Sequence, residues 1–294
     1  MSPSFYSAQS NTPDLDSHTS AATIWRVNTH SELEHDLEAM VRDAGAILLR
    51  HFGKVRNIRR KENASSVVCE GDLAAEASLL KTIRARYPDD SIIAEESGSH
   101  RGSSSRHWIL DPLDGTSNFV AGLPWFGVQV GLLEDGQAKA AAMYLPVENT
   151  LFISVAGQGV RRNGKPVHVT SERSLSNVLC AFGFDPVANP RQSRANINLL
   201  MRVSPSVRNT RTTNSLWDFC YALDGQFGGC INLNCRIWDI IPLVLMMPEA
   251  GGKITDIAGR PISFDLGETA SERVYTVLGA SKRLHARLLE ALQS

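Results

Sequence analysis

Residues 107–119 read His-Trp-Ile-Leu-Asp-Pro-Leu-Asp-Gly-Thr-Ser-Asn-Phe, and this stretch predicts a buried strand that runs into polar side chains. The apolar run 108–110 is typical of a short buried strand. We expect Pro112 to end it, because a proline nitrogen cannot donate a ladder hydrogen bond. Asp111 and Asp114 then fall at the carboxyl end of the strand. On a tight turn, carboxylates three residues apart can reach one cation.

The residues between and after these aspartates add further groups. The Leu113 carbonyl, exposed on such a turn, is another oxygen for the same cation. Gly115 lets the backbone approach a ligand closely, and the amides of Gly115 and Thr116 face an anion if they open a helix. The pattern indicates a metal-plus-phosphate corner. Taken alone, an ordinary Asp-Pro and Asp-Gly turn before a helix cap is the simpler interpretation, because short motifs often match by chance.

Length and composition are those of an ordinary globular protein. The 294 residues exceed a comfortable single core, so we expect one large layered domain or two fused halves. The chain has 30 Lys and Arg against 31 Asp and Glu, so it lacks the excess of positive charge that is typical of nucleic-acid-binding proteins. No apolar run has the ~20 residues of a membrane span, and the start lacks a basic region followed by an apolar one. We expect a cytoplasmic protein with no nucleic-acid or membrane partner.

The five cysteines are scattered, odd in number and without a Cys-x-x-Cys pair. This usage favours buried reduced thiols over zinc ligands or disulfides.

Periodicity and capping signals predict the order of the elements. The polar start, residues 1–30, predicts a mobile tail. Helices are predicted at 31–51, 72–87, 190–203, 215–224, 239–247 and 281–292, with Pro242 in a first turn and Pro248 kinking the chain if the helix continues. Strands are predicted at 91–94, 128–133, 138–144, 151–155, 167–169, 178–182, 253–256 and 274–278, with those from 128 to 169 as an antiparallel meander and 98–106 as a loop.

Four carboxylate-bearing stretches stand at the ends of apolar elements. Each alone is explained as a cap or a turn. Together they predict a metal site, because converging carboxylates repel one another unless cations neutralise them, and oxygen ligands suit Mg²⁺ or Mn²⁺. Such a site implies phosphoryl transfer to water. The stretches are Asp72, Glu95-Glu96, Asp111 with Asp114, and Asp239.

Residues 31–294 resemble the inositol monophosphatase family. That family carries Glu-Glu after a strand, then Asp-Pro-x-Asp-Gly-Thr-x-Asn-Phe, then Trp-Asp followed by Glu-Ala-Gly-Gly. Here these motifs stand at 95–96, 111–119, 238–239 and 249–252. The resemblance implies an α/β layered fold, an αβαβα sandwich, with an α+β half over about 31–185 and an α/β half over about 186–294.

The resemblance also implies an activity. Its members hydrolyse small phosphate monoesters such as inositol 1-phosphate with two or three Mg²⁺ ions, for which Mn²⁺ can substitute, are often sensitive to Li⁺, and are commonly homodimers. The partner implied is a small phosphorylated alcohol.

Roles carry over by motif. The resemblance implies that the metal ligands are Glu95, Asp111, the Leu113 carbonyl, Asp114 and Asp239, with Glu96 nearby. Gly115 and Thr116 would hold the phosphate, with Asn232 and Asp239 also facing the substrate. Asp72, acting through Thr116, would orient and deprotonate the attacking water, beside Glu95. Lys61 matches a lysine near the metals, although a solvated surface lysine fits equally well.

Two departures bear on specificity and on the helix after Asp239. Inositol-selective members carry an acidic residue six positions before Trp-Asp, where this chain has Asn232. The alternative to an inositol phosphate as substrate is therefore a related specificity within the family, such as histidinol phosphate or a sugar phosphate. Pro242 and Pro248 replace the usual helix formers.

Two other functions stay open at this point. An aspartyl-phosphate phosphatase of the haloacid dehalogenase type would use Asp-x-Asp, and the extra residue between Asp111 and Asp114 argues against it. A catalytically silent metal- or phosphate-binding module is the other, and the presence of both Asp72 and Thr116 argues against that. Serine-hydrolase chemistry lacks a Gly-x-Ser-x-Gly elbow.

Overall fold

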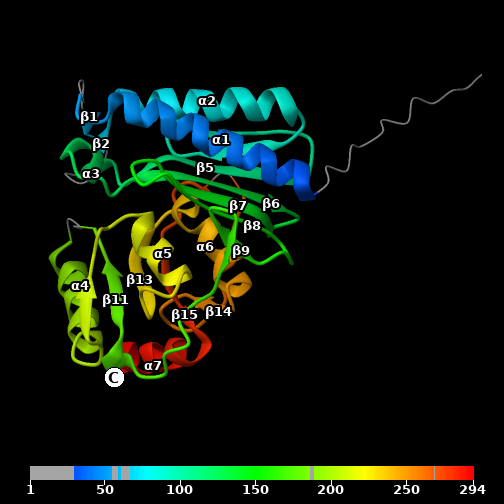
Figure 1. Ribbon diagram of the computed structural model, residues 1–294. Helices are drawn as coiled ribbons and strands as arrows, with labels where there is room; N and C mark the ends of the chain where they lie inside the picture. The colour runs from blue at the N-terminus through cyan, green and yellow to red at the C-terminus, as the bar shows by residue number, and fades with distance from the viewer. Residues whose placement is uncertain (1–29, 55–58, 61–66, 186–188, 268) are drawn as a thin grey trace, which may run out of the picture.

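The computed structural model describes residues 30–54, 59–60, 67–185, 189–267 and 269–294, which form five layers (Figure 1). The predicted tail, up to residue 29, and Lys61 lie outside the described residues. Helices α1 (His30–His51) and α2 (Glu70–Arg86) cover one face of an eight-stranded sheet. Helices α5 (Leu216–Leu223) and α6 (Ile237–Glu249) lie between this sheet and a five-stranded one, whose outer side carries α4 (Pro190–Val203) and α7 (Lys282–Gln293). The predicted αβαβα sandwich is confirmed.

The eight-stranded sheet has the order β10-β9-β8-β7-β6-β5-β3-β4. Its neighbours are antiparallel except β3 and β5, which run parallel. The predicted meander is confirmed, whereas β4 falls in the predicted loop and β9 was not predicted. The strands are β3 (Ser91–Ala94), β4 (Gly98–His100), β5 (Arg106–Asp114), β6 (Gly127–Glu134), β7 (Gln137–Leu145), β8 (Thr150–Val155), β9 (Val160–Arg162) and β10 (Lys165–Val167). A separate ladder joins β1 (Arg59–Arg60) to β2 (Val67–Val68), which leads into α2.

The five-stranded sheet has the order β12-β11-β13-β15-β14, with β11 parallel to both β12 and β13. Strands β12 and β13 were not predicted. Strand β11, which precedes residue 185, pairs with β12 and β13 of this sheet. The strands are β11 (Leu179–Gly183), β12 (Asn209–Arg211), β13 (Gly229–Cys235), β14 (Gly252–Thr255) and β15 (Tyr275–Ser281).

Strand β5 continues past Pro112, so the prediction that this proline ends the ladder is wrong. Asp111 pairs with Gln129 and Asp114 pairs with Gly127, which leaves one extra residue on β5. This is a β-bulge, and a proline is tolerated there because the bulged segment needs no donor.

Helix α6 begins at Ile237, so Pro242 lies in its second turn and not in the first, as predicted, while Pro248 lies inside the helix near its end. Each proline removes one donor to the carbonyl four residues earlier. Burial between the two sheets compensates, since most of its apolar side chains are buried and tertiary packing supplies most helix stability. The Glu249 carboxylate also accepts hydrogen bonds from the Gly157 and Gly159 amides at 2.7 and 2.8 Å, which fastens the end of α6 to the turn after β8.

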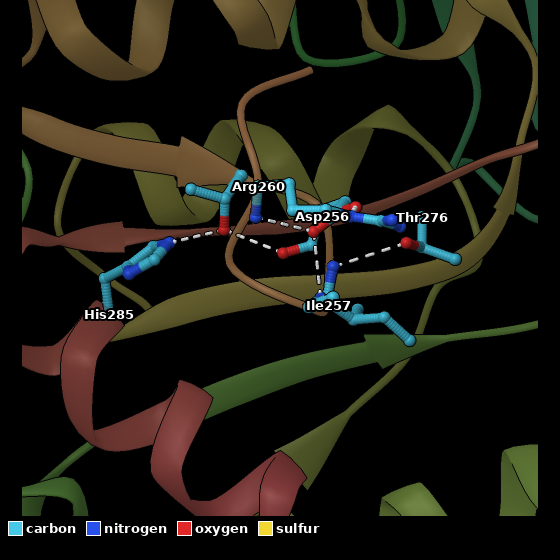
Figure 2. A network of polar contacts seen from close by, with 7 residues as sticks. Asp256, Ile257, Arg260, Thr276 and His285 are labelled. Atoms are coloured by element: carbon cyan, nitrogen blue, oxygen red, sulfur yellow. Dashed lines mark hydrogen bonds and ion pairs between the residues drawn. The ribbon is translucent and has the colours of Figure 1, made fainter.

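The outer end of the second sheet is fastened to α7 by polar contacts (Figure 2). Buried His285 of α7 lies 2.9 Å, Nε2 to Oγ1, from Thr255 at the end of β14. The Asp256 carboxylate accepts from the Arg260 amide and side chain, and the Ile257 amide donates to the Thr276 hydroxyl. These contacts close the turn that follows β14.

All five cysteines are buried free thiols, as predicted. Among the described residues, no helix is long and apolar enough to cross a bilayer.

Candidate active site

Three aspartates from both halves of the chain converge between the sheets. One carboxylate oxygen from each of Asp111, Asp114 and Asp239 lies within 4.8 Å of those of the other two. The first two come from the bulged end of β5, and Asp239 is the third residue of α6. Glu95 follows β3, whose Ala94 pairs with Leu110 of parallel β5, so Glu95 lies beside Asp111.

These carboxylates open into a cavity of about 630 Å³. Nine of the residues predicted for the site line it, whereas Asp72 does not and Lys61 lies outside the described residues. The nine are Glu95, Glu96, Asp111, Leu113, Asp114, Gly115, Thr116, Asn232 and Asp239. The structure thus brings the predicted residues together, while their individual roles stay predictions.

Asp72 lies behind the cavity wall and reaches it through a hydroxyl. The Thr116 hydroxyl lies 3.3 Å from Asp72 Oδ1 and 2.9 Å from the Leu113 carbonyl oxygen. Its single hydrogen can serve only one of these acceptors at a time. Asp72 Oδ2 accepts from both the amide and the thiol of Cys69, at 2.9 and 2.8 Å. Asp72 is therefore both the capping residue of α2 and the partner of Thr116.

Burial and mutual repulsion disfavour ionisation throughout this cluster. Burial raises the pKa of Asp111 and of Asp239 well above the ordinary range, and the charges of neighbouring carboxylates raise both further. Burial also raises the pKa of Asp114 to about 7. Burial raises the pKa of Asp72 to about 6, with the Glu95 charge adding to the effect. Positive charge in the cavity would relieve this repulsion.

Neighbouring groups hold the carboxylates in place. Asp114 accepts from the Leu216 amide at the start of α5 and from the Gln129 side chain, both at 2.7 Å. Asp239 accepts from the Arg236 amide at 2.6 Å, which caps α6. Gln129 was not predicted. It is the one polar side chain in the apolar run 128–133, and this is the signal that could have found it.

Gly115 stands where no other residue fits. Its φ is +84°, and an added Cβ would lie 2.6 Å from the Trp125 carbonyl oxygen. The glycine turns the chain from β5 into α3 (Thr116–Val120), and Gly115 is the residue that caps the start of this short helix.

Polar residues from the second sheet form the other end of the cavity. Asn232 and Asn234 alternate along β13, and Gly183 at the end of parallel β11 pairs with Asn232. The residues there that were not predicted include Asp185, just after β11, and Asn214, just before α5. The carboxyl ends of parallel strands are a common place for ligands.

The oxygen-only donor set suits a hard divalent cation such as Mg²⁺ or Mn²⁺. Buried carboxylates with raised pKa values fit such an ion, because a cation compensates the charges that burial penalises. The fold and this cluster define a layered α/β protein with a buried carboxylate cluster whose oxygen donors suit divalent cations.

Comparison with known proteins gives the family. The model of the inositol monophosphatase family matches residues 29–294, and the chain belongs to this family. "Nus factor SuhB" of Salmonella typhimurium is 33% identical over 221 residues, which cover 74% of this chain and 82% of that protein. Membership supports a phosphatase activity, although relatives such as this one are named for another role.

Solved structures agree with the fold. "Extragenic suppressor protein suhB" from Bartonella henselae superposes with a TM-score of 0.80 at 26% identity, over 89% of this chain and 98% of that one. The Thermotoga maritima IMPase gives 0.78 at 25% identity, over 90% of this chain and 97% of that one.

Proposed function

We propose that this protein is a Mg²⁺-dependent phosphatase that hydrolyses small phosphate monoesters with water. The observation that carries the proposal is the convergence of three carboxylates beside the Thr116 and Asp72 pair, at one end of a cavity large enough for a small ester.

The cation ligands would be the side chains of Glu95, Asp111, Asp114 and Asp239 with the Leu113 carbonyl, and Glu96 would serve a third ion. When bound, the cations would neutralise the carboxylates and the ester phosphate and make the attacking water more acidic. The amides of Gly115 and Thr116 would hold phosphate oxygens.

Asp72 and Thr116 would remove the proton of the attacking water. The water gives its proton to the Thr116 oxygen while the Thr116 hydroxyl gives its own to Asp72, so the threonine is unchanged. A base whose pKa is about 6 is ionised at neutral pH and still takes a proton readily.

The alcohol part of the substrate would lie toward the second sheet. Asn232 occupies the position where inositol-selective relatives place an acid, and an amide both donates and accepts hydrogen bonds. We therefore propose a broader specificity than strict inositol monophosphatase activity, with inositol, histidinol and sugar phosphates as candidate substrates.

The test is a panel of phosphate monoesters assayed with and without Mg²⁺. Phosphate release should stop in excess EDTA and return with Mg²⁺, and Asp111→Asn should raise the Mg²⁺ concentration needed and lower turnover. Full activity in excess EDTA would exclude the mechanism. Trapping of a phosphoenzyme would favour an aspartyl-phosphate mechanism instead.

The names of the relatives raise a second function, the Nus-factor role that "SuhB" denotes in Salmonella typhimurium. A strain lacking that protein, supplied with wild type or with Asp72→Asn, would test both the role and its dependence on catalysis. The homodimer and the cytoplasmic location stay predictions, to be checked by light scattering and by cell fractionation.

A further inference from the structure

Two acidic residues of the cavity lie outside the proposed cation cluster, Asp185 and Glu272. They share the alcohol end with Asn214, Asn234 and Arg236. Asp185 follows β11 by two residues and is half-buried.

The Asp185 carboxylate accepts hydrogen bonds from two side-chain amides. Its Oδ1 accepts from Asn214 Nδ2 at 2.6 Å and its Oδ2 accepts from Asn234 Nδ2 at 3.3 Å. An amide nitrogen only donates, so both carboxylate oxygens of Asp185 act as acceptors here. A carboxylate has about four acceptor sites, so two amides leave capacity for a ligand.

Backbone hydrogen bonds hold the segments that carry these two asparagines. Asn214 adopts the left-handed conformation, φ +52°, in a turn whose Thr213 and Asn214 amides donate to the buried Asp218 carboxylate at 3.0 to 3.2 Å. The Asn234 amide donates to the Asn232 side chain at 3.1 Å. Asparagine tolerates the left-handed conformation better than most residues, and these hydrogen bonds hold the turn in place.

The charges at this end of the cavity favour a cation. Among the described lining residues Arg236 is the one cationic side chain, and its Nη1 donates to the Glu272 carbonyl. Asp185 and Glu272 together outweigh it. The hydroxyls of an inositol ring or a neutral sugar can donate hydrogen bonds to these carboxylates, but an ammonium group also compensates their charge.

We propose that Asp185 selects phosphate esters whose alcohol carries a protonated amine, so that the phosphate lies at the carboxylate cluster and the ammonium at Asp185. This inference rests on the proposed function for the position of the phosphate. It names the substrate class as amino-alcohol phosphates.

The experiment compares amino with hydroxyl esters of equal length. The pairs are 2-aminoethyl with 2-hydroxyethyl phosphate and 4-aminobutyl with 4-hydroxybutyl phosphate, assayed in saturating Mg²⁺ with wild type, Asp185→Asn and Asp185→Ser. Asp43→Asn, an exposed aspartate on α1 at the far side of the first sheet, is the matched control.

Wild type and the control should prefer the amino ester in at least one pair by about tenfold in kcat/KM, as expected for a charge-assisted contact. In both Asp185 variants the two esters should have kcat/KM values within about twofold of each other, because KM for the amino ester rises. The kcat/KM for the hydroxyl ester should change little. An unchanged ratio in the variants, or no preference in either pair, would overturn the inference. An equal fall in kcat/KM for both esters together with a higher Mg²⁺ requirement would also overturn it, because Asp185 would then be a cation ligand.

Binding separates this inference from the proposed function. Calorimetry of 3-aminopropylphosphonate and 3-hydroxypropylphosphonate in Mg²⁺ needs no turnover. If no ester is hydrolysed, the proposed function fails, yet tighter binding of the amine in wild type than in Asp185→Asn would still support the inference. Equal binding would refute it.

Discussion

Asp72→Asn should remove most of the catalysis without weakening the fold. A positioned base contributes ~10² to 10⁴ in rate, so we expect kcat to fall within that range. The side chain has the same shape, and its carbonyl oxygen can accept both bonds from Cys69. Its amide can donate to the Thr116 oxygen, whose own hydrogen then goes to the Leu113 carbonyl 2.9 Å away. No polar group is left unpaired.

The stability change follows from the pKa of Asp72. A folded-state value of about 6 against an ordinary 3.8 means that the folded protein holds this proton more tightly than the unfolded chain. Stability is therefore lost as the pH rises from about 4 to 6, and the loss is about 3 kcal/mol above pH 6, at 1.36 kcal/mol for each pH unit. The neutral amide in Asp72→Asn avoids this cost of burying a charge, although the hydrogen bonds that it accepts from Cys69 are weaker than those of the carboxylate by about 1 kcal/mol in total.

We therefore expect the unfolding midpoint of Asp72→Asn at pH 7.5 in EDTA to be unchanged or a few degrees higher. Asp218→Asn is the matched control, because Asp218 is a buried capping aspartate whose pKa burial likewise raises to about 6. Both its oxygens accept backbone amides, so this variant should lose stability but keep kcat within tenfold. In wild type, kcat should fall on acidification at or below pH 6, as Asp72 becomes protonated. A midpoint more than about 5 °C lower, or a kcat within tenfold of wild type, would show that Asp72 is only a cap.

Three further outcomes follow from the same structure. Mg²⁺ should raise the unfolding midpoint by relieving carboxylate repulsion, by about 2.7 kcal/mol at a hundred times the dissociation constant; a thermal shift that Asp111→Asn does not reduce would contradict this. For wild type, the kcat/KM values for inositol 1-phosphate and glycerol 2-phosphate should lie within about tenfold of each other. Asn232→Glu should raise the ratio of these values in favour of inositol 1-phosphate. A wild-type preference for inositol 1-phosphate above about a hundredfold would refute the role given to Asn232. Burial, with Lys253 nearby, lowers the pKa of His285 to about 4, so stability should be lost as the pH falls below 6.5, by up to about 2 kcal/mol at pH 5. In urea unfolding His285→Gln should remove this pH dependence, and an unchanged slope would assign it to another group.

Local signals predicted much of the fold. Helix 31–51, strand 91–94 and helix 190–203 agree with the structure to within a residue, because apolar period, caps and proline act within a few residues of one another. Strand β13 was not predicted, and it begins at a glycine, a residue that is depleted in strands. The alternation of Asn232 and Asn234 with buried neighbours was the available signal.

The alcohol end of the cavity depends on contacts that sequence patterns do not carry. Asp185 meets Asn214 and Asn234 across 29 and 49 residues of chain. Which loops meet there is decided by the order of β11, β12 and β13 in the sheet, and two of those strands were not predicted.

The wrong prediction at Pro112 points to how the carboxylates of Asp111 and Asp114 are brought together. In a regular strand, residues three apart point to opposite faces, so Asp111 and Asp114 could not share a cation. One extra residue restores the parity, and the β5 bulge supplies it between these two aspartates. Pro112 suits the bulge because it has no hydrogen to donate. The proline that suggests a strand end is thus part of the feature that lets one strand present two carboxylates to the same side.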